Sequence, residues 1–306
     1  MQTTGRAVGR LSTAPVEEGV ESLCRAAACD NPDVAAGLAV LGLTAAFLLA
    51  VGAVLARLDG AREAVARETA RTRAERDAFE RFRRRVVDIE AGEVARATPR
   101  AAGTDALATP AGGSGADDAG LAETRRAYRE TVMATPHYQE EYDETLTENV
   151  AEEFSGAVAG ALVEEGGALT PALQATLAGG AERARRQRTE LLSRLETEES
   201  SLEDARGTLA PAVEAAERTV ERDLAYAGYS DIVGEYERLE WHERRVETVL
   251  SDRQGRVHDE ESERRYWFEY LYDSLPSPYP VLSAGTETLS LLSEAKASLT
   301  AAASER

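Results

Sequence analysis

Histidine, cysteine and lysine are scarce in this chain of 306 residues, which has three His, two Cys and a single lysine, Lys296. No Glu stands three positions before His137, His242 or His258, so the Glu-x-x-His pairs of a di-iron helical bundle are lacking. His242 also has no second His one helical turn away, as a zinc-protease helix requires. We therefore expect no metal site and no cofactor.

The chain also lacks the glycine patterns of nucleotide-binding loops. The sequence around Ser114, Gly-Gly-Ser-Gly-Ala, is only distantly similar to a nucleophile elbow, because no strand precedes it. Carboxylates are abundant, but on acidic helices they usually form a solvated face. The sequence therefore predicts no catalytic residue and a protein that is not an enzyme. A hydrolase that uses Glu and His side chains on the helices would need loss of activity at His242 or His258 to support it.

Negative charge predominates, with 55 Asp and Glu against 35 Lys and Arg and a net charge of -20. This balance argues against a nucleic-acid surface, because phosphate binding requires clustered Lys and Arg. A basic protein partner is one explanation of the acidity. Habitat is the better one, because the single Lys, the many Ala and the acidic polar residues resemble the composition of halophilic archaeal proteins. In molar salt, screening acts within about 3 Å, so a large net charge costs little.

Residues 34–55 form the longest apolar run, with 22 consecutive uncharged positions in a chain that is 29% charged. As a helix rising about 1.5 Å per residue, the run is roughly 33 Å long, enough to cross a bilayer core. It starts too far from the N-terminus and is too long for a signal peptide. We therefore predict a retained transmembrane helix and a single-pass protein of the cell membrane.

The arginines flanking this run are placed asymmetrically. Upstream, only Arg25 lies within about twenty residues of it, the distance over which the positive-inside rule operates. Five arginines follow within that distance: Arg57, Arg62, Arg67, Arg71 and Arg73. The rule places the bulk of the chain in the cytoplasm and residues 1–33 outside as a short tail, although Arg6 and Arg10 weaken the asymmetry.

Small residues recur every four positions within the run, at Gly42, Ala46 and Ala50. Such spacing permits close packing of two membrane helices and hence self-association, whereas the simpler interpretation is an Ala-rich membrane helix. Upstream, Cys24 and Cys29 are compatible with a disulfide, with lipid attachment or with two free thiols.

The remaining sequence is helical. Residues 56–96 have no Pro and repeat Leu58, Val65, Thr72, Phe79 and Val86 every seven positions, which predicts an Arg-rich juxtamembrane helix with coiled-coil character. Residues 97–120, with five Gly and two Pro, are expected to be a flexible linker. Residues 121–306 then form an acidic helical domain.

Start and stop signals divide this domain. Thr135-Pro136 and Thr170-Pro171 predict helices over 136–165 and 171–226, and Pro211 is expected to kink or split the second. Further helices are expected over 231–273 and 283–303, with 171–226 and 231–273 as an antiparallel hairpin. No strand-like alternation persists, so the fold class is all-α: a transmembrane helix, a juxtamembrane helix and an antiparallel helical bundle.

Aromatic residues are concentrated near the C-terminal end. The densest group, Tyr266, Trp267, Phe268, Tyr270 and Tyr272, points around a whole helix, so a single face cannot bury it. One interpretation is a core plug, packed with Tyr226, Tyr229, Tyr236 and Trp241. The others are a partner-binding surface, since Tyr and Trp dominate interface hot spots, and a belt at the membrane interface.

The layout of nearly the whole chain resembles uncharacterised single-pass coiled-coil proteins of halophilic archaea, most of all in GYSDIVGEYERLEWHERR and YWFEYLYDSLPSPYP. The resemblance implies no function and no residue role. We expect a scaffold or tether that holds protein partners, or further copies of itself, at the cytoplasmic face of the lipid bilayer. The alternative is a signalling protein in which the membrane helix acts on residues 56–96. Its weaknesses are the short outer tail and a linker that would uncouple the bundle.

Overall fold

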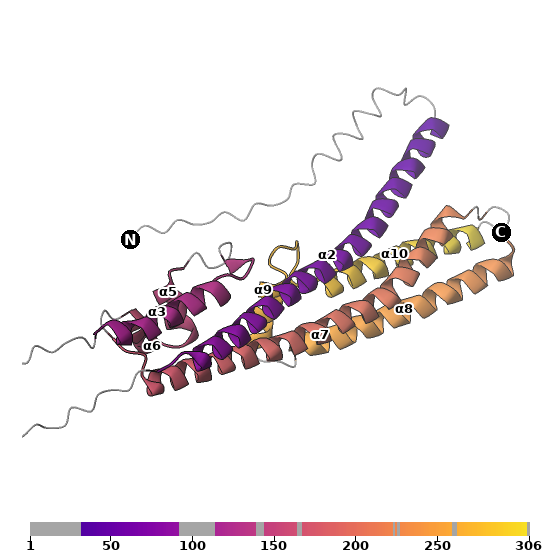
Figure 1. The fold of residues 1–306 in the computed structure, drawn as a ribbon. Coiled ribbons are helices and arrows are strands. Elements are labelled where there is room, and N and C mark those ends of the chain that lie inside the picture. Colours follow the sequence, from indigo (N-terminus) through magenta and orange to yellow (C-terminus); the bar gives the residue numbers. More distant parts are fainter. Residues whose placement is uncertain are drawn as a thin grey trace, which may run out of the picture. The chain divides into compact units, whose positions relative to one another are not determined.

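The computed structural model describes residues 32–91, 114–138, 144–163, 167–222, 224, 227–258 and 262–304. Within these ranges every regular element is a helix (Figure 1). They are α2 (Pro32–Asp88), α3 (Ser114–Thr131), α5 (Leu146–Glu153), α6 (Gly156–Val163), α7 (Pro171–Glu221), α8 (Tyr229–His258), α9 (Ser262–Leu271) and α10 (Pro280–Ser304). The all-α prediction is confirmed. Cys24, Cys29 and most of the predicted linker lie outside the described residues.

The chain forms two compact units. One, here called the anchor unit, comprises the chain up to Leu58, Ala205–Glu261 and Tyr279–Arg306. The other, the aromatic unit, comprises Asp59–Asp204 and Ser262–Pro278. The long helices α2 and α7 contribute residues to both units. This division differs from the predicted one, in which the juxtamembrane helix stands apart from the bundle.

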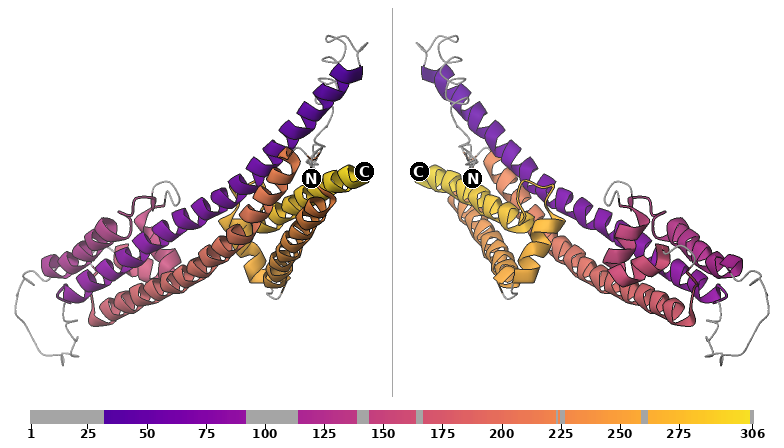
Figure 2. Two further views of the ribbon diagram at one scale, coloured as in Figure 1. Left: turned by 90° about the vertical axis from the view of Figure 1, so that its right-hand side faces the viewer. Right: turned by 90° about the vertical axis from the view of Figure 1, so that its left-hand side faces the viewer.

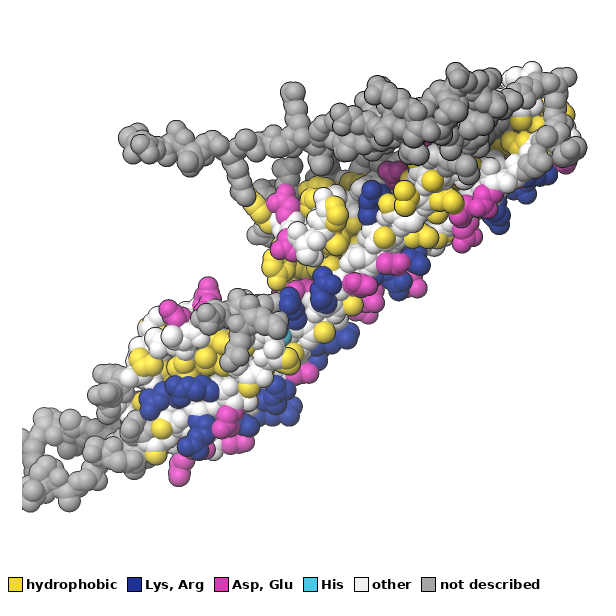
Figure 3. Space-filling model, turned by 90° about the horizontal axis from the view of Figure 1, so that it is seen from above, with side chains coloured by type: hydrophobic (Ala, Val, Ile, Leu, Met, Phe, Trp, Pro, Cys, Tyr) yellow, Lys and Arg dark blue, Asp and Glu magenta, His cyan; other side chains and the backbone are white. Residues whose placement is uncertain are grey.

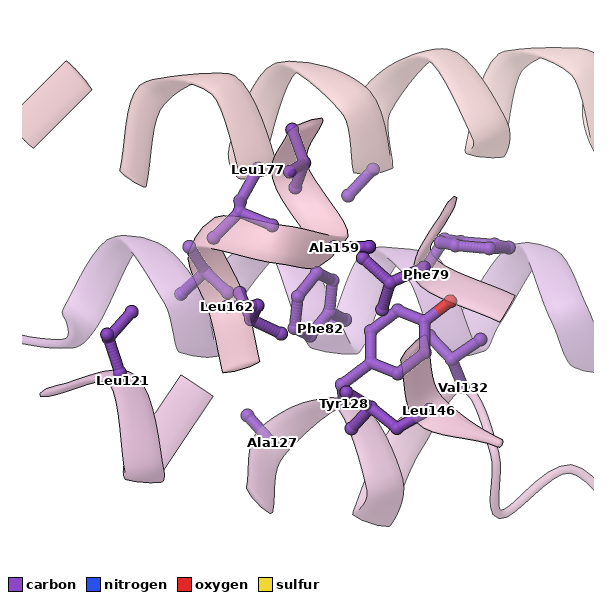
Figure 4. Close-up of a cluster of buried hydrophobic side chains, with 14 of the residues drawn as sticks. Phe79, Phe82, Leu121, Ala127, Tyr128, Val132, Leu146, Ala159, Leu162 and Leu177 are labelled. Atoms are coloured by element: carbon purple, nitrogen blue, oxygen red, sulfur yellow. The ribbon is translucent and has the colours of Figure 1, made fainter. Parts of the chain in front are cut away.

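The aromatic unit is built around side chains from α2, α3, α5, α6 and α7 (Figure 4). Phe82 lies at its centre and meets Tyr128 edge-on, with ring centroids 5.0 Å apart, and Phe154 at 6.1 Å. Phe79 and Val86 extend the same face of α2 and are almost fully buried. The seven-residue repeat of α2 is thus real, but it packs against other helices of the same chain. For this reason residues 59–91 belong to the core and are not a separate stalk.

The C-terminal end of α2 is held by a side chain from α7. The amide of Gln174 donates hydrogen bonds to the carbonyl oxygens of Val86 and Ile89 at 2.8 and 2.7 Å. The last carbonyls of a helix have no partner within it, so this amide completes the end of α2. It also ties α2 to the start of α7 within the aromatic unit.

Two predicted boundaries differ in this unit. The segment beginning at Pro136 is a turn, and the helix starts later, after Thr145. There Thr145 and Glu148 form a reciprocal capping box, which satisfies two backbone donors. In addition, residues 114–120, assigned to the linker, form the first turns of α3.

Helix α7 begins where the Thr-Pro signal predicts. The hydroxyl of Thr170 accepts a hydrogen bond from the backbone N–H of Leu173 at 3.1 Å, and Pro171 takes the first position. The helix then continues through Pro211 to Glu221 without interruption. Burial of the neighbouring Leu209, Ala212 and Val213 explains why the hydrogen bond that Pro removes does not end the helix.

The anchor unit is an antiparallel bundle in which α8 turns back along the end of α7 and α10 lies along α8 (Figures 1 and 2). Gly285 allows α10 to approach closely, because a Cβ atom there would overlap the side chain of Leu250. Lys296 of α10 donates to Glu243 of α8 at 2.5 Å, and Thr219 of α7 donates to Glu235 of α8 at 3.3 Å. The predicted hairpin of α7 and α8 is thus present, and α8 ends at His258 rather than running on to residue 273.

Candidate functional site

The apolar run lies on the first half of α2, which is helical from Pro32. Among the described residues, the stretch from Thr44 to Asp88 is the one helix with a segment long and apolar enough to cross a membrane. Its outward side chains are apolar, and Leu49 is 76% exposed while Leu48 is 40% exposed. In Figures 1 and 2 the first turns of α2 project beyond the other helices of the anchor unit. Such an exposed apolar helix is unusual for a soluble surface.

Within the part of the chain that the structure describes, the small-residue face of this helix is largely exposed. A side chain added at Gly42 would meet nothing within 4 Å, and Ala46 is exposed while Ala50 is half-buried. These three residues are therefore open to a second helix or to lipid. Self-association through them stays a prediction.

Another face of the same helix is buried in the anchor unit. Phe47 and Val51 are 6% and 8% exposed, and Val54 and Leu58 are completely buried. This packing was not anticipated from the sequence, since an uninterrupted apolar run gives no sign that one side of it meets protein. The run therefore has one face in the bundle and one face outward.

The aromatic segment divides into two faces of α9. Phe268 and Tyr272 are buried and stack with parallel rings 6.4 Å apart. The hydroxyl of Tyr272 donates to the buried carboxylate of Glu198 at 2.5 Å, which explains how Glu198 is accommodated on α7 beside the buried Leu195 and Leu202. Phe268 and Tyr272 are therefore core residues, which corrects their assignment to a partner surface.

The other face of α9 points outward. Tyr266 is 68% exposed and Tyr270 58% exposed, while Trp267 is half-buried. Of the side chains expected to pack with this group, Tyr229 and Trp241 belong to the anchor unit and are 68% and 50% exposed. The core-plug interpretation thus holds for Phe268 and Tyr272, whereas Tyr266 and Tyr270 form an exposed surface.

A hollow of about 390 Å³ lies beside Tyr270 in the aromatic unit. It is lined by one face of α2 and the end of α9: Ala64, Arg67, Glu68, Arg71, Tyr270, Leu271, Asp273 and Ser274. The phenol of Tyr270 reaches the carboxylate of Glu68 at 3.4 Å. Charges of both signs therefore line the hollow together with Ala64, Tyr270 and Leu271, an arrangement suited to seating part of a protein partner. On the face shown in Figure 3, basic and acidic side chains alternate in the same way.

Sequence reasoning missed a buried polar cluster in the aromatic unit. Arg188 donates to Glu75 at 3.0 Å and to both oxygens of Glu153, and its guanidinium lies over the ring of Phe79 at 5.0 Å. His137 lies 2.9 Å from the other oxygen of Glu75. These charges are four-fifths buried and join α2, α5 and α7. Nothing in their spacing along the chain indicates that they meet.

The cluster is structural in character. Within the described ranges, no group of three or more His, Cys, Asp or Glu side chains is arranged to hold a metal ion. Close by, the buried hydroxyl of Tyr128 donates to Asn149 at 2.5 Å, and burial raises the pKa of this phenol. Every one of these groups is engaged by another side chain of the core, so the cluster joins helices of the aromatic unit.

Comparison with known proteins gives one match. A model of the family described as "Domain of unknown function (DUF7260)" matches residues 56–296, which cover parts of both structural units and begin directly after the apolar run. Neither the curated proteins nor the solved structures contain a match. The match spans most of the chain, which therefore belongs to the DUF7260 family of proteins of unknown function.

Proposed function

We propose that the protein is a single-pass, membrane-anchored helical scaffold that holds protein partners at the cytoplasmic face of the cell membrane. The observation that carries this proposal is the outward apolar face of α2, with Leu49 76% exposed, on a helix that continues directly into the core of the folded domain. The arginines that follow the run favour a cytoplasmic domain. The acidic, Lys-poor composition supports an origin in a halophilic archaeon, so the experiments below use molar salt.

The partner surface that fits best is the outward face of α9 with the adjacent hollow. Exposed tyrosines flanked by a cavity and by charges of both signs have the character of an interface hot spot with its polar rim. Tyr266 and Tyr270 supply the rings, and Arg67 and Asp273 supply rim charges. Such a surface recognises a partner without any reaction.

A first experiment tests the anchor. The full chain is expected to float with vesicles in a density gradient and to resist carbonate extraction. A variant with Leu48→Asn, Leu49→Asn and Ala46→Asn is expected to remain in the soluble fraction, because polar residues are costly in hydrocarbon. Ala46, Leu48 and Leu49 all lie on the exposed part of the helix, so helix content should be retained. Flotation of the variant equal to that of the parent would contradict the anchor.

A second experiment tests the scaffold. Crosslinking in native membranes is compared between the parent and the variant Tyr266→Ala/Tyr270→Ala, which is expected to fold because both rings are exposed. The matched control is Tyr229→Ala, another exposed tyrosine in the anchor unit. A discrete set of partners lost in the double variant and kept in the control supports the scaffold. Identical partners in all three proteins would remove the tyrosine surface from the proposal.

Signalling through the membrane helix is the second candidate, and one observation favours it. Helix α2 is continuous from Pro32 to Asp88 and its later residues are core residues, so no flexible linker separates the anchor from the folded domain. The objection that a linker would uncouple the two therefore falls. Insertion of three glycines after Ala66 should abolish a signalling output while leaving membrane attachment intact, whereas a simple tether would tolerate it.

A further inference from the structure

The same side chains of the apolar run of α2 can pack either in the anchor unit or against lipid. Phe47, Val51, Val54 and Leu58 follow one another at spacings of four, three and four, so they share one face of the helix, and all are buried in the anchor unit. A membrane-spanning helix would instead present these side chains to lipid or to another membrane helix. Both arrangements satisfy the apolar groups, but they cannot exist together.

The length of the apolar run shows that it cannot pack in the bundle and span the bilayer at the same time. Only residues 34–46 of the run precede Phe47, and as a helix they measure roughly 20 Å. A bilayer core is about 30 Å thick and needs about 20 apolar residues. With the bundle packed as observed, the run is too short to span. Extending the span to residue 55 provides the missing length but takes Phe47, Val51 and Val54 out of the bundle.

Two features make this exchange feasible. Lipid tails are as apolar as a protein core, so the side chains lose little hydrophobic stabilisation when they move from one to the other. In addition, the Nη1 atom of Arg57 is buried with no hydrogen-bond partner in the part of the chain that the structure describes. An unsatisfied buried donor is unfavourable, and at a membrane surface a long Arg side chain can reach water and headgroups.

We propose that residues 47–55 alternate between the anchor unit and the bilayer, so that full insertion of the membrane helix opens the bundle. In the packed state the segment covers apolar side chains of the anchor unit. In the inserted state that surface is uncovered, so membrane insertion changes the packing of the anchor unit. This inference rests on the proposed membrane anchor and adds its regulation.

The test uses single-cysteine variants in a full chain whose Cys24 and Cys29 are replaced by Ser. Val54→Cys reports the buried face, Leu49→Cys reports the outward face, and Leu239→Cys, fully buried in α8, is the control. Each cysteine carries an environment-sensitive fluorophore, attached after mild unfolding. Phosphatidylcholine vesicles with spin-labelled acyl chains are then added, and quenching shows which positions meet lipid. Circular dichroism verifies that each labelled protein refolds.

Quenching at Val54→Cys equal to that at Leu49→Cys, with none at Leu239→Cys, is the expected result. Quenching at Leu49→Cys alone would overturn the exchange while keeping the anchor. Quenching at all three positions would also overturn it, because the bundle would then enter the bilayer intact. No quenching at any position would instead refute the membrane anchor, so failure of the inference and failure of the proposed function are distinguishable.

A second measurement addresses the opened bundle. Hydrogen exchange in α10 is expected to accelerate when vesicles are added, because the side chains that cover this unit have left. The variant Leu48→Asn/Leu49→Asn, which should not insert, is expected to show no acceleration. Unchanged exchange in the inserted parent protein would contradict the opening.

Discussion

The two compact units are stabilised in different ways. The aromatic unit joins its helices with a ring cluster and with buried charged groups, among them Arg188 between Glu75 and Glu153. The described core of the anchor unit is mainly aliphatic and includes the inward face of the apolar run, at Phe47 and Val54. Buried ion pairs require one geometry, whereas apolar contacts can be replaced by lipid. The comparison suggests that one unit is the rigid part and the other is the part that can rearrange.

The largest expected effect comes from Arg188→Met. Removal of the guanidinium leaves two buried carboxylates without their partner, which destabilises by about 3–5 kcal/mol. In the anchor unit, Lys296→Met removes a single ion pair with Glu243 and should cost less, because the Glu243 carboxylate is 27% exposed and can be hydrated when its partner is lost. Chemical unfolding of both variants measures the two values. Equal costs would remove the distinction between the units.

Neighbouring glycines of α7 give a matched pair with an intermediate effect. Gly180→Ala places a methyl group against the ring of Phe154, and such overpacking should destabilise by about 1–3 kcal/mol. Gly179→Ala enters open space and should stabilise by about 0.5–1 kcal/mol, because Ala loses less backbone freedom in a helix. Chemical unfolding of the two glycine variants measures both changes in the free energy of unfolding. Opposite signs at adjacent positions would show how closely the aromatic unit is packed.

Acid should weaken the units at different pH values. Burial and then Arg245 and Arg218 lower the pKa of His242 in the anchor unit below 6.5. The unfolded chain therefore binds this proton more readily, and stability falls as the pH drops below about 6.5. His242→Gln should remove this loss. A pH titration of the unfolding midpoint, with and without the substitution, tests it, and a persistent loss in His242→Gln would contradict the assignment.

In the same titration, protonation of carboxylates should destabilise the aromatic unit at a lower pH. Hydrogen bonds from Arg83 lower the pKa of Glu80, and those from Arg185 lower the pKa of Glu182. Their contribution is present above about pH 4.5 and is lost as the pH falls through the folded pKa values. We expect probes in α3 to report unfolding at lower pH than probes in α8. Simultaneous loss at both would indicate that the units unfold together.

The smallest effect on stability is expected at Tyr266→Ala. The ring is 68% exposed, so the free energy of unfolding should change by less than about 0.5 kcal/mol. Phe268→Ala, two residues away and buried, should cost about 3–5 kcal/mol. Thermal unfolding of the pair measures the contrast. A large loss at Tyr266 would show that its ring is packed in the native protein and would weaken its role as a partner contact.

Several elements follow from local sequence alone. The apolar run, the start of α7 at Thr170-Pro171 and the final helix after the proline segment all depend on nearby residues, and each was predicted. The start of α5 was predicted at the wrong Thr. Thr135-Pro136 and Thr145 both carry helix-start signals, and only the reciprocal bond with Glu148 favours the second.

Of the candidate site, the sequence indicated which segments matter but not which side chains face solvent. The aromatic group at 266–272 was identified as distinctive, yet its division into buried Phe268 and Tyr272 and exposed Tyr266 and Tyr270 depends on the helices that pack on α9. Periodicity shows which residues share a face, but it does not show which face another helix covers.

By itself, then, the sequence determined that the protein is helical and acidic and carries an apolar segment of membrane length, because these properties depend on composition and on neighbours along the chain. Tertiary structure alone decided that residues 59–91 join the core and that Arg188 meets Glu75, 113 positions away. It also decided that Phe47 and Val54 pack inside a bundle. Each of these depends on contacts between distant residues, and such contacts leave no periodic trace in a single sequence.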